Sequence, residues 1–451
     1  MKFIETIKNI FSIEELRNKI LYTLLLVLVY RIGSYIVIPG VDPTSLDALA
    51  DRAQNGILGM VNVFAGGAFS RASIMALGIM PYISASIAVQ LLTIAVPYFQ
   101  KLQKEGESGT RQINQITRYL TIVVTMVQGA GYLTLLNNNG ISIVEGFSPV
   151  LFTLTAMIVL TAGTLFAMWL GEKITDNGIG NGISLLIMIG IMAGLPGSFL
   201  AELTARFGAS GGGLVIFIFE LVILFIIILV SIALVQATRR VAIQYAKRNV
   251  VQGGKMMQAG GNRQYLPLKV NASGVMPIIF AQAIMFLPSV VYQFIAGENA
   301  SGWFVNSFND PKSLLYNIFT FLLVVVFTYF YTAMVVNPQQ IADQLKKDGG
   351  IIPGIKPGKH TEEFIDTVVS RITLPGSIFL GFIAILPAFA MIGGVNTGFA
   401  YFFGGTSLLI MVGVILDTLQ QIESHLMMRH YDGLMQGGSK LKGRHSVGAS
   451  I

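Results

Sequence analysis

The sequence lacks cysteine entirely and is poor in charge. With no cysteine among 451 residues, a disulfide-stapled fold is excluded, as are thiolate nucleophiles, iron–sulfur sites and zinc ribbons. Charged residues make up only 12% of the chain, about half of the roughly 25% found in soluble domains. Apolar residues make up 53%, and the mean hydropathy is +0.68. Because the apolar residues are collected in long blocks, the composition predicts a polytopic membrane protein and excludes a disordered chain.

Ten apolar segments are long enough, or nearly long enough, to cross a bilayer as helices of about 20 residues. They are residues 20–38, 74–97, 117–136, 150–170, 183–195, 214–235, 272–295, 314–336, 372–392 and 402–420. The fifth is short and bounded by glycine, so on its own it is also compatible with a re-entrant piece. Residues 1–19 are charged and amphipathic and are not followed by a small-residue cleavage site, so we do not expect a removable signal peptide.

The basic residues predict the orientation of these spans. With the N-terminus inside, all but five of the 30 Lys and Arg residues fall on inner segments. The exceptions are Arg52, Arg71, Arg206 and Lys312 outside, and Arg31 within the first span. Cytoplasmic loops carry an excess of Lys and Arg, so we expect both termini to be cytoplasmic. The net charge of +7 then follows from topology and does not indicate a nucleic-acid-binding domain.

Two inner loops, residues 236–271 and 337–371, are long and basic. Their cations include Arg239, Arg240, Lys247, Arg248, Lys255, Arg263, Lys269, Lys346, Lys347, Lys356 and Lys359. The glycine pairs at 253–254 and 260–261 divide the first loop into two arms, which predicts a projecting hairpin. One interpretation is topological charge that contacts anionic lipid. Much shorter loops would serve that purpose, and the length favours a docking surface for a large partner.

A short internal repeat links the second and seventh spans. The run Gly78-Ile79-Met80-Pro81 recurs as residues 274–277, Gly-Val-Met-Pro, and an isoleucine follows two residues after each proline, at Ile83 and Ile279. Ten spans divided five and five make these helices counterparts, and an odd number per half inverts the repeat. We therefore expect halves at 1–195 and 196–425 with a tail at 426–451. The two prolines predict matched helix kinks along one path, although chance similarity or harmless kinks would look the same.

Chemistry-bearing patterns are missing. The ionisable candidates within spans are Arg31, Glu220 and Asp417, and the four histidines lie in inner loops or the tail. The sequence has no HExxH, GxSxG or Walker motif. We therefore expect no enzyme activity, no cofactor and no metal site.

Residues 56–70 form a separate short apolar segment. They are too few to cross a membrane and are interrupted by Asn62 and by Gly66-Gly67. The segment is typical of a half-helix that folds back into an outer funnel and satisfies its backbone within protein. An amphipathic helix lying on the membrane surface is the alternative.

Over residues 13–443 the chain resembles the SecY family, the channel subunits of the bacterial Sec protein-export translocon. The motifs that carry the resemblance are FAGGAFSRASIMALGIMPYISASI (64–87), KEGESGTRQINQITRY (104–119), MWLGEKITDNGIGNGIS (168–184), RRVAIQYAKR (239–248), LPLKVN (266–271), NPQQIADQLKKDGGIIPGIKPG (337–358) and YFFGGTSLLI (401–410). The resemblance implies an all-α fold of ten transmembrane helices in two inverted five-helix halves around a central pore.

The resemblance also implies roles for individual residues. The pore ring falls on Ile79, Ile83, Ile183, Ile187, Ile279 and Ile410. Residues 56–70, with Asn62, Phe64, Gly66 and Gly67, correspond to the plug that stoppers the outer funnel. The lateral gate comprises Pro81, Ser84, Gln90, Pro277 and Gln282. The spacing of the first four ring residues agrees with this, since each i, i+4 pair shares one helix face, and stiff β-branched side chains can seal a dry constriction. Without the resemblance, each isoleucine is equally compatible with packing or lipid contact.

The implied partners are SecE-like and SecG-like small subunits, the motor ATPase SecA, the ribosome, signal sequences with unfolded preproteins, and anionic lipid. The docking residues would be Arg239, Arg240, Lys247, Arg248, Lys346, Lys347 and Lys356, with Lys247 and Arg248 suited to ribosomal RNA phosphate. The chain departs from the family at Lys356, where an arginine is usual, so the bidentate guanidinium is lost. The apolar, glycine-rich tip of the first loop is a second departure.

Together these features predict a channel in the bacterial cytoplasmic membrane that passes unfolded secretory chains across it and releases membrane helices into it. An ion-coupled transporter is disfavoured because its spans should carry carboxylates. A membrane enzyme is disfavoured by the missing nucleophile and metal ligands. A lipid scaffold is disfavoured because that role does not require a matched pair of proline-containing spans.

Overall fold

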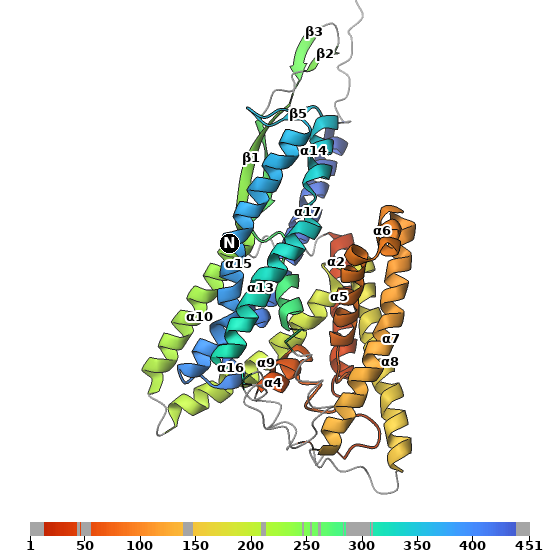
Figure 1. The fold of residues 1–451 in the computed structure, drawn as a ribbon, viewed down its shortest axis with the longest axis vertical. Coiled ribbons are helices and arrows are strands. Elements are labelled where there is room, and N and C mark those ends of the chain that lie inside the picture. The colour runs from red at the N-terminus through yellow and green to blue at the C-terminus, as the bar shows by residue number, and fades with distance from the viewer. Residues whose placement is uncertain are drawn as a thin grey trace, which may run out of the picture.

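A computed structural model describes residues 13–42, 46, 56–138, 148–208, 213–245, 248–252, 255–259, 263–282, 284–285, 307 and 310–438. The fold is a helical bundle with a small β region projecting from one end (Figure 1). In this view the helices from the first part of the chain stand on one side and those from the last part on the other. Two groups of helices are thus visible, as two halves would require.

The first group contains the helices that precede residue 208. They are α2 (Glu14–Gly33), α4 (Gly56–Phe64), α5 (Met80–Ala95), α6 (Pro97–Lys104), α7 (Glu107–Asn138), α8 (Pro149–Asn177) and α9 (Gly182–Phe207). The second group contains α10 (Gly213–Gln236), α13 (Leu314–Val335), α15 (Lys359–Ile392), α16 (Thr397–Ala400) and α17 (Gly405–Gly438). Of the predicted seventh span, residues 276–282 and 284–285 are helical, and most of the remainder lies outside the described residues.

The described helices fit a polytopic membrane protein. Seven are long and apolar enough to cross a bilayer, and an eighth is obtained if α5 and α6 count as one bent span. The first predicted span corresponds to α2, which carries charge at both ends. With the partly described seventh span, the described helices are compatible with ten crossings.

The prediction of one continuous second span with a proline kink was wrong. Helix α5 begins only at Met80, and α6 leaves it at 95°. Pro81 lies in the first turn of α5, and Pro277 is likewise the second residue of its helix. At that position a proline costs no helical hydrogen bond, since the first amides of a helix have no intrahelical acceptor.

The repeated Gly-x-Met-Pro run nevertheless has the same backbone conformation in both places. Gly78 and Gly274 both adopt positive φ, +53° and +65°, and a helix starts two residues later in each case. Glycine tolerates this region because it has no Cβ. The repeat is therefore a matched helix-start motif rather than a matched kink.

Helix α9 connects the two groups. It packs against α2, α4 and α8 on one side and against α10, α16 and α17 on the other. It runs to Phe207 and contains Pro196, so the predicted fifth span (183–195) was too short. The predicted division of the halves at residue 195 lies inside this helix. Similarly, α17 extends beyond the predicted start of the tail at 426.

Two hydrogen bonds hold the turn that leads into α9. The amide of Ile179 donates to Thr23 Oγ1 of α2 at 3.1 Å, and the amide of Gly180 donates to Gln421 Oε1 of α17 at 2.8 Å. Gly182 fits closely against α8, because a Cβ there would lie 2.1 Å from the carbonyl oxygen of Gly171. The start of α9 is thereby fixed to both groups of helices.

The two long loops fold into one unit, here called the β platform. Strands β1 (Thr238–Tyr245) and β4 (Arg263–Lys269) pair antiparallel, and β2 (Arg248–Gln252) with β3 (Lys255–Ala259) forms the tip hairpin. The predicted projecting hairpin is thus present. The second loop contributes α14 (Pro338–Lys347) and β5 (Gly350–Ile351), and β5 pairs with β1.

A hydrophobic core of its own supports the β platform. Residues from the sheet, α14 and the first turns of α15 share one buried cluster: Val241, Ile243, Leu268, Leu345, Ile352, Ile365 and Val369. The two loops that the sequence presented separately are therefore one structural element.

A buried ionic cluster, the Arg206 node, joins α9 to α10 at the end opposite the β platform. The guanidinium of Arg206 donates to Glu202 Oε1 at 2.7 Å, to Glu220 of α10, and to the carbonyl oxygen of Gly394 at 2.8 Å. Glu202 also accepts from the amide of Asn396 at 2.8 Å. Both carboxylates are at most 5% exposed. One arginine therefore ties α9 to α10 and to the turn before α16.

We expect Arg206→Gln to destabilise the protein by roughly 3 kcal/mol, because two buried carboxylates lose their cation. The free energy of unfolding by sodium dodecyl sulfate titration is the measurement. Arg111→Gln is the matched control, since its pair with Glu107 is largely exposed and removal should cost less than about 0.5 kcal/mol. Equal losses in the two variants would contradict a structural role for the Arg206 node.

Candidate functional site: an isoleucine-lined constriction beside a short helix

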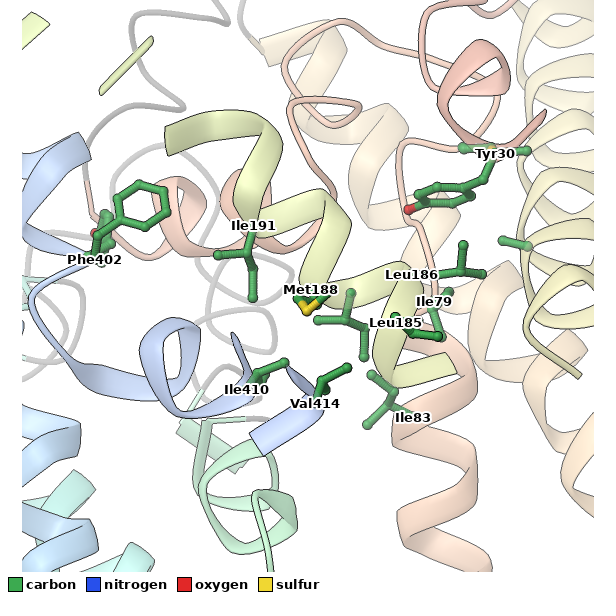
Figure 2. Packing of buried hydrophobic residues seen from close by; sticks show 14 of the residues in the cluster. Tyr30, Ile79, Ile83, Leu185, Leu186, Met188, Ile191, Phe402, Ile410 and Val414 are labelled. Atoms are coloured by element: carbon green, nitrogen blue, oxygen red, sulfur yellow. The ribbon is translucent and has the colours of Figure 1, made fainter. Parts of the chain in front are cut away.

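All six isoleucines predicted for the ring belong to one hydrophobic cluster. Ile79, Ile83, Ile187 and Ile410 are at most 9% exposed, and Ile183 and Ile279 pack against them while partly buried. Figure 2 shows Ile410 and Val414 of α17 entering the cluster from one side, and Ile79 and Ile83 from the other. Residues from α5, α9, α17 and the seventh span therefore meet at one place.

Local structure explains how these side chains are presented. Ile79 is the N-cap of α5 and Ile83 lies one turn later, so both project from the beginning of that helix toward the cluster. Ile187 belongs to a run of buried α9 residues that extends from Leu185 to Met188. Ile183 is turned partly toward α8, since a Cβ on Gly171 would lie 2.9 Å from its Cγ1. Ile183 therefore contacts α8 as well as the isoleucine cluster.

The isoleucine cluster is apolar and tightly packed. A small cavity of about 10 Å³ lies between Tyr30, Phe64, Ile79, Ile83 and Ile187, close to the smallest volume that holds one water molecule. Aliphatic side chains offer no hydrogen-bond donors or acceptors. Such a collar can close by contact alone, and a narrow apolar passage without a chain in it sheds water and blocks ions.

Helix α4 lies directly against this constriction. It packs on α9, and Val63 and Phe64 contact the isoleucine cluster. A Cβ on Gly190 of α9 would lie 2.7 Å from the carbonyl oxygen of Phe64, so only glycine permits this approach. The predicted half-helix within residues 56–70 is therefore present over Gly56–Phe64 and sits on the ring residues.

Non-helical backbone follows α4 as far as residue 79 and is held by hydrogen bonds. Asn62 Oδ1 accepts from the amide of Ser70 at 3.0 Å, and Tyr132 Oη donates to the carbonyl oxygen of Phe69 at 2.8 Å. Gly66 and Gly67 have φ of +64° and +80°. This arrangement satisfies the requirement that irregular backbone at membrane depth be enclosed by protein.

The predicted gate residues lie on the two matched helices. Pro81 and Pro277 are buried, while Ser84, Gln90 and Gln282 are partly buried. Ser84 Oγ donates to the carbonyl oxygen of Met80 at 3.1 Å. The side-chain nitrogen of Gln90 donates to Ser86 Oγ at 3.3 Å, whereas its oxygen is buried without a partner in the described residues. Gln90 is thus a weak point in an otherwise apolar surface.

The predicted docking residues lie on the β platform, except Lys247, which is outside the described residues. Arg239, Arg240, Lys346, Lys347 and Lys356 are exposed. Arg248 begins β2. The loop that carries Lys356 is anchored by buried Ile352, and the carbonyl oxygen of Lys356 accepts from Thr361 Oγ1 at 3.0 Å. The described cations are thereby presented on one folded unit.

No group of three or more His, Asp or Glu side chains suited to a metal ion occurs in the described part of the chain.

A family model described as SecY matches residues 73–419. Curated relatives named "Protein translocase subunit SecY" are 42% identical in Streptomyces galbus, Mycobacterium bovis and Bacillus licheniformis, covering 94 to 96% of this chain and 98 to 99% of theirs. The chain belongs to the SecY family.

Solved structures show the same fold. One, reported as "The structure of a protein conducting channel", superposes with a TM-score of 0.62 at 17% identity and covers 90% of this chain and 91% of that one. Another, "Sec61 in the Canine ribosome-channel complex from the endoplasmic reticulum", gives a TM-score of 0.56 at 17% identity with the same coverage. The fold predicted from the sequence, a helical polytopic protein of two halves around a pore, is confirmed.

Sequence reasoning missed three structurally important residues in this SecY-family chain. Glu202 lies between the predicted fifth and sixth spans, a segment that was expected to be an outer loop. Its spacing of four residues from Arg206 is nevertheless typical of an ion pair on one face of a helix. Tyr30 is 1% exposed and lines the cavity beside the ring, but one tyrosine within an apolar span gave no signal. The sequence also gave no sign that Gly190 lies against α4.

If the isoleucine cluster seals the resting channel, replacing Ile83 and Ile187 together with serine should let ions leak, because the constriction becomes wider and wettable. Conductance of planar bilayers containing the complex is the measurement. Ile158→Ser with Ile218→Ser is the matched control, since both side chains are more than half exposed on the outer face of the bundle. An unchanged resting current in the Ile83/Ile187 variant would contradict the sealing role.

Proposed function

We propose that the chain is a protein-conducting channel that moves unfolded secretory polypeptides across the bacterial cytoplasmic membrane. The observation that carries this proposal is the meeting of six isoleucines from four separate segments in one dry cluster, with α4 packed on it. An apolar collar makes no specific bonds, so it can fit many different extended chains. The curated relatives, named as protein translocase subunits, support the same function.

Lateral release of membrane helices would take place between α5 and the seventh span. Polar side chains on these helices, at Ser84, Gln90 and Gln282, would weaken an apolar contact between them. Gln90 supports this role, because its buried oxygen has no partner in the described residues, and a buried unsatisfied polar group lowers the stability of a closed contact. A hydrophobic signal helix entering between them would replace that contact.

The channel itself would do no covalent chemistry, and energy for transport would come from a separate motor ATPase or from synthesis on the ribosome. The β platform is the expected docking site for both. A ribosome is present in the solved Sec61 complex with the same fold, which supports ribosome binding by this chain. SecE-like and SecG-like subunits, signal sequences and anionic lipid are the remaining proposed partners.

The positive-inside bias supports an orientation with both termini in the cytoplasm.

The alternative to a protein-conducting channel is an ion-coupled transporter. The Arg206 node holds the buried carboxylates Glu202 and Glu220, and both are bound to one arginine. A coupling site needs carboxylates free to bind and release an ion, so the described spans favour the channel.

Crosslinking tests the proposal directly. A photoreactive amino acid at Ile83 should crosslink to a stalled secretory chain during transport, because the chain must pass the ring. The matched control places the same group at Ile158, which faces outward and is 68% exposed. The products are read on gels with a radiolabelled substrate. Crosslinks at Ile158 but none at Ile83 would contradict passage through the ring.

Lys356 tests the motor contact. If the contact depends on charge, Lys356→Arg should leave motor ATPase stimulation during transport unchanged and Lys356→Glu should abolish it. Lys104→Glu, an exposed cation on α6 outside the β platform, is the control. Full stimulation with Lys356→Glu would show that this loop carries topological charge only, and improved stimulation with Lys356→Arg would show that a guanidinium is required.

A further inference from the structure

The segment that follows α4 has two parts with different attachments. Residues 68–79 are fixed to the bundle. Ala68, Ala72 and Ser73 are fully buried, and Ser73 forms a β-bridge with Val37. Flanking this bridge, the amide of Ile38 donates to Ala72 and that of Ile74 donates to Ile36, both at 2.8 Å. The hydroxyl of Tyr132 on α7 holds the carbonyl of Phe69 from another side.

Helix α4 is attached differently: it packs on α9, and the amide of Ser70 donates to its Asn62 Oδ1 at 3.0 Å, but among the described residues no β-bridge joins it to another segment. Its residues from Val61 to Phe64 are only half-buried, and it joins the fixed segment through Gly66 and Gly67. Two consecutive glycines at positive φ can change their backbone angles without side-chain clashes, and hinges commonly absorb motion at such places. These two residues therefore form the boundary between a helix that can move and the fixed segment 68–79.

One polar contact reaches across this boundary from a different helix. Nη1 of Arg31, in the last turn of α2, donates to the carbonyl oxygen of Gly66 at 3.2 Å. Nη2 of Arg71 donates to the same oxygen at 2.9 Å. The Arg71 guanidinium stacks on the ring of Tyr35 at 4.1 Å from its centroid, and Arg31 Nη2 donates to the Tyr35 hydroxyl at 3.4 Å.

The carbonyl oxygen of Gly66 is an acceptor that two cationic side chains share. Among the described residues, neither Arg31 nor Arg71 takes part in an ion pair. Within the described part of the chain, the two like charges share one neutral oxygen and one aromatic ring. That oxygen lies just past the C-terminal end of α4, where carbonyl groups favour cations. Of the two arginines, only Arg31 comes from outside the segment that contains α4.

We infer that Arg31 is a positioning residue that holds α4 against the ring in the resting channel, and that α4 leaves by rotation at Gly66-Gly67 while residues 68–79 stay in place. This rests on the proposed channel function and on the plug role that the family resemblance implies for residues 56–70. Opening would break the hydrogen bond from Arg31 to Gly66, the hydrogen bond from the Ser70 amide to Asn62 Oδ1, and the close contact between Gly66 and Gly190, whose atoms leave no room for a Cβ. The predicted segment 56–70 is thereby divided into a moving part and a fixed part.

The role of Arg31 is tested with the reconstituted complex in planar bilayers. Arg31→Gln should raise the fraction of time that resting channels conduct by about tenfold, the shift expected from one charge-assisted hydrogen bond. Arg31→Lys keeps a charged donor and should restore most of the seal. Arg111→Gln, an exposed arginine on α7, is the control. An unchanged resting current in Arg31→Gln, or an equal leak in Arg31→Lys, would overturn the inference.

A crosslink distinguishes two explanations of a leak in Arg31→Gln: release of α4 and a general loss of structure. Phe64→Cys and Ile187→Cys line the same small cavity, and the absence of native cysteine removes background. Closing this pair with a short bifunctional thiol reagent should suppress the leak of Arg31→Gln. A leak that persists with the pair closed would overturn the inference, since α4 would then be in place.

The position of the hinge is tested by a second pair. Val37→Cys with Ser73→Cys joins the two bridged residues on the fixed side, where strand partners lie within disulfide range. Export should continue with this pair oxidised and stop with the Phe64/Ile187 pair closed, and reversal of either link should restore the starting rate. If both pairs stop export, the hinge assignment is wrong and the plug role stands. If neither does, the plug role itself fails.

Discussion

The structure depends first on the rule that backbone polar groups inside a membrane must find partners within the protein. Most of the chain meets it with helices. A long non-helical run is the segment from Ala65 to Ile79, where small buried residues allow close packing and bonds from Asn62, Ser70 and Tyr132 supply partners. Because such a run is possible only where protein surrounds it, α4 and the start of α5 are held at the centre of the bundle, beside the ring.

Helix α9 is the second organising element. Its beginning is bonded to α2 and α17 through the turn at residues 178–181, its middle carries Ile187 and Gly190, and its end carries Glu202 and Arg206. The ring, the seat of α4 and the ionic link between the two groups of helices thus lie along one helix. These points are joined by continuous helix rather than by loops, with Pro196 as a point of compliance between Gly190 and Glu202.

Hydropathy and the distribution of Lys and Arg were enough to predict a polytopic helical protein, because long apolar runs and charge asymmetry are local properties of the sequence. The helix ends were predicted poorly. Helices α7, α8, α15 and α17 continue well past their apolar cores into polar turns, which hydropathy ignores. The residues Ile79, Ile83, Ile187 and Ile410 could be named only by resemblance, since an isoleucine in a span has the same sequence signal whether it faces lipid or a pore. The pairing of β5 with β1 was out of reach, because the two strands are about a hundred residues apart and β5 has only two residues.

Helix α15 has a mechanical consequence. It begins in the core of the β platform, where Ile365 and Val369 are buried, and continues for 34 residues to the turn that contributes Gly394 to the Arg206 node. At 1.5 Å per residue this is a rod of about 50 Å, with prolines at positions 375 and 387 as its points of compliance. One continuous helix therefore links the β platform to the Arg206 node at the opposite end of the bundle, so a displacement of the platform would reach that node directly unless the helix bends at one of its two prolines.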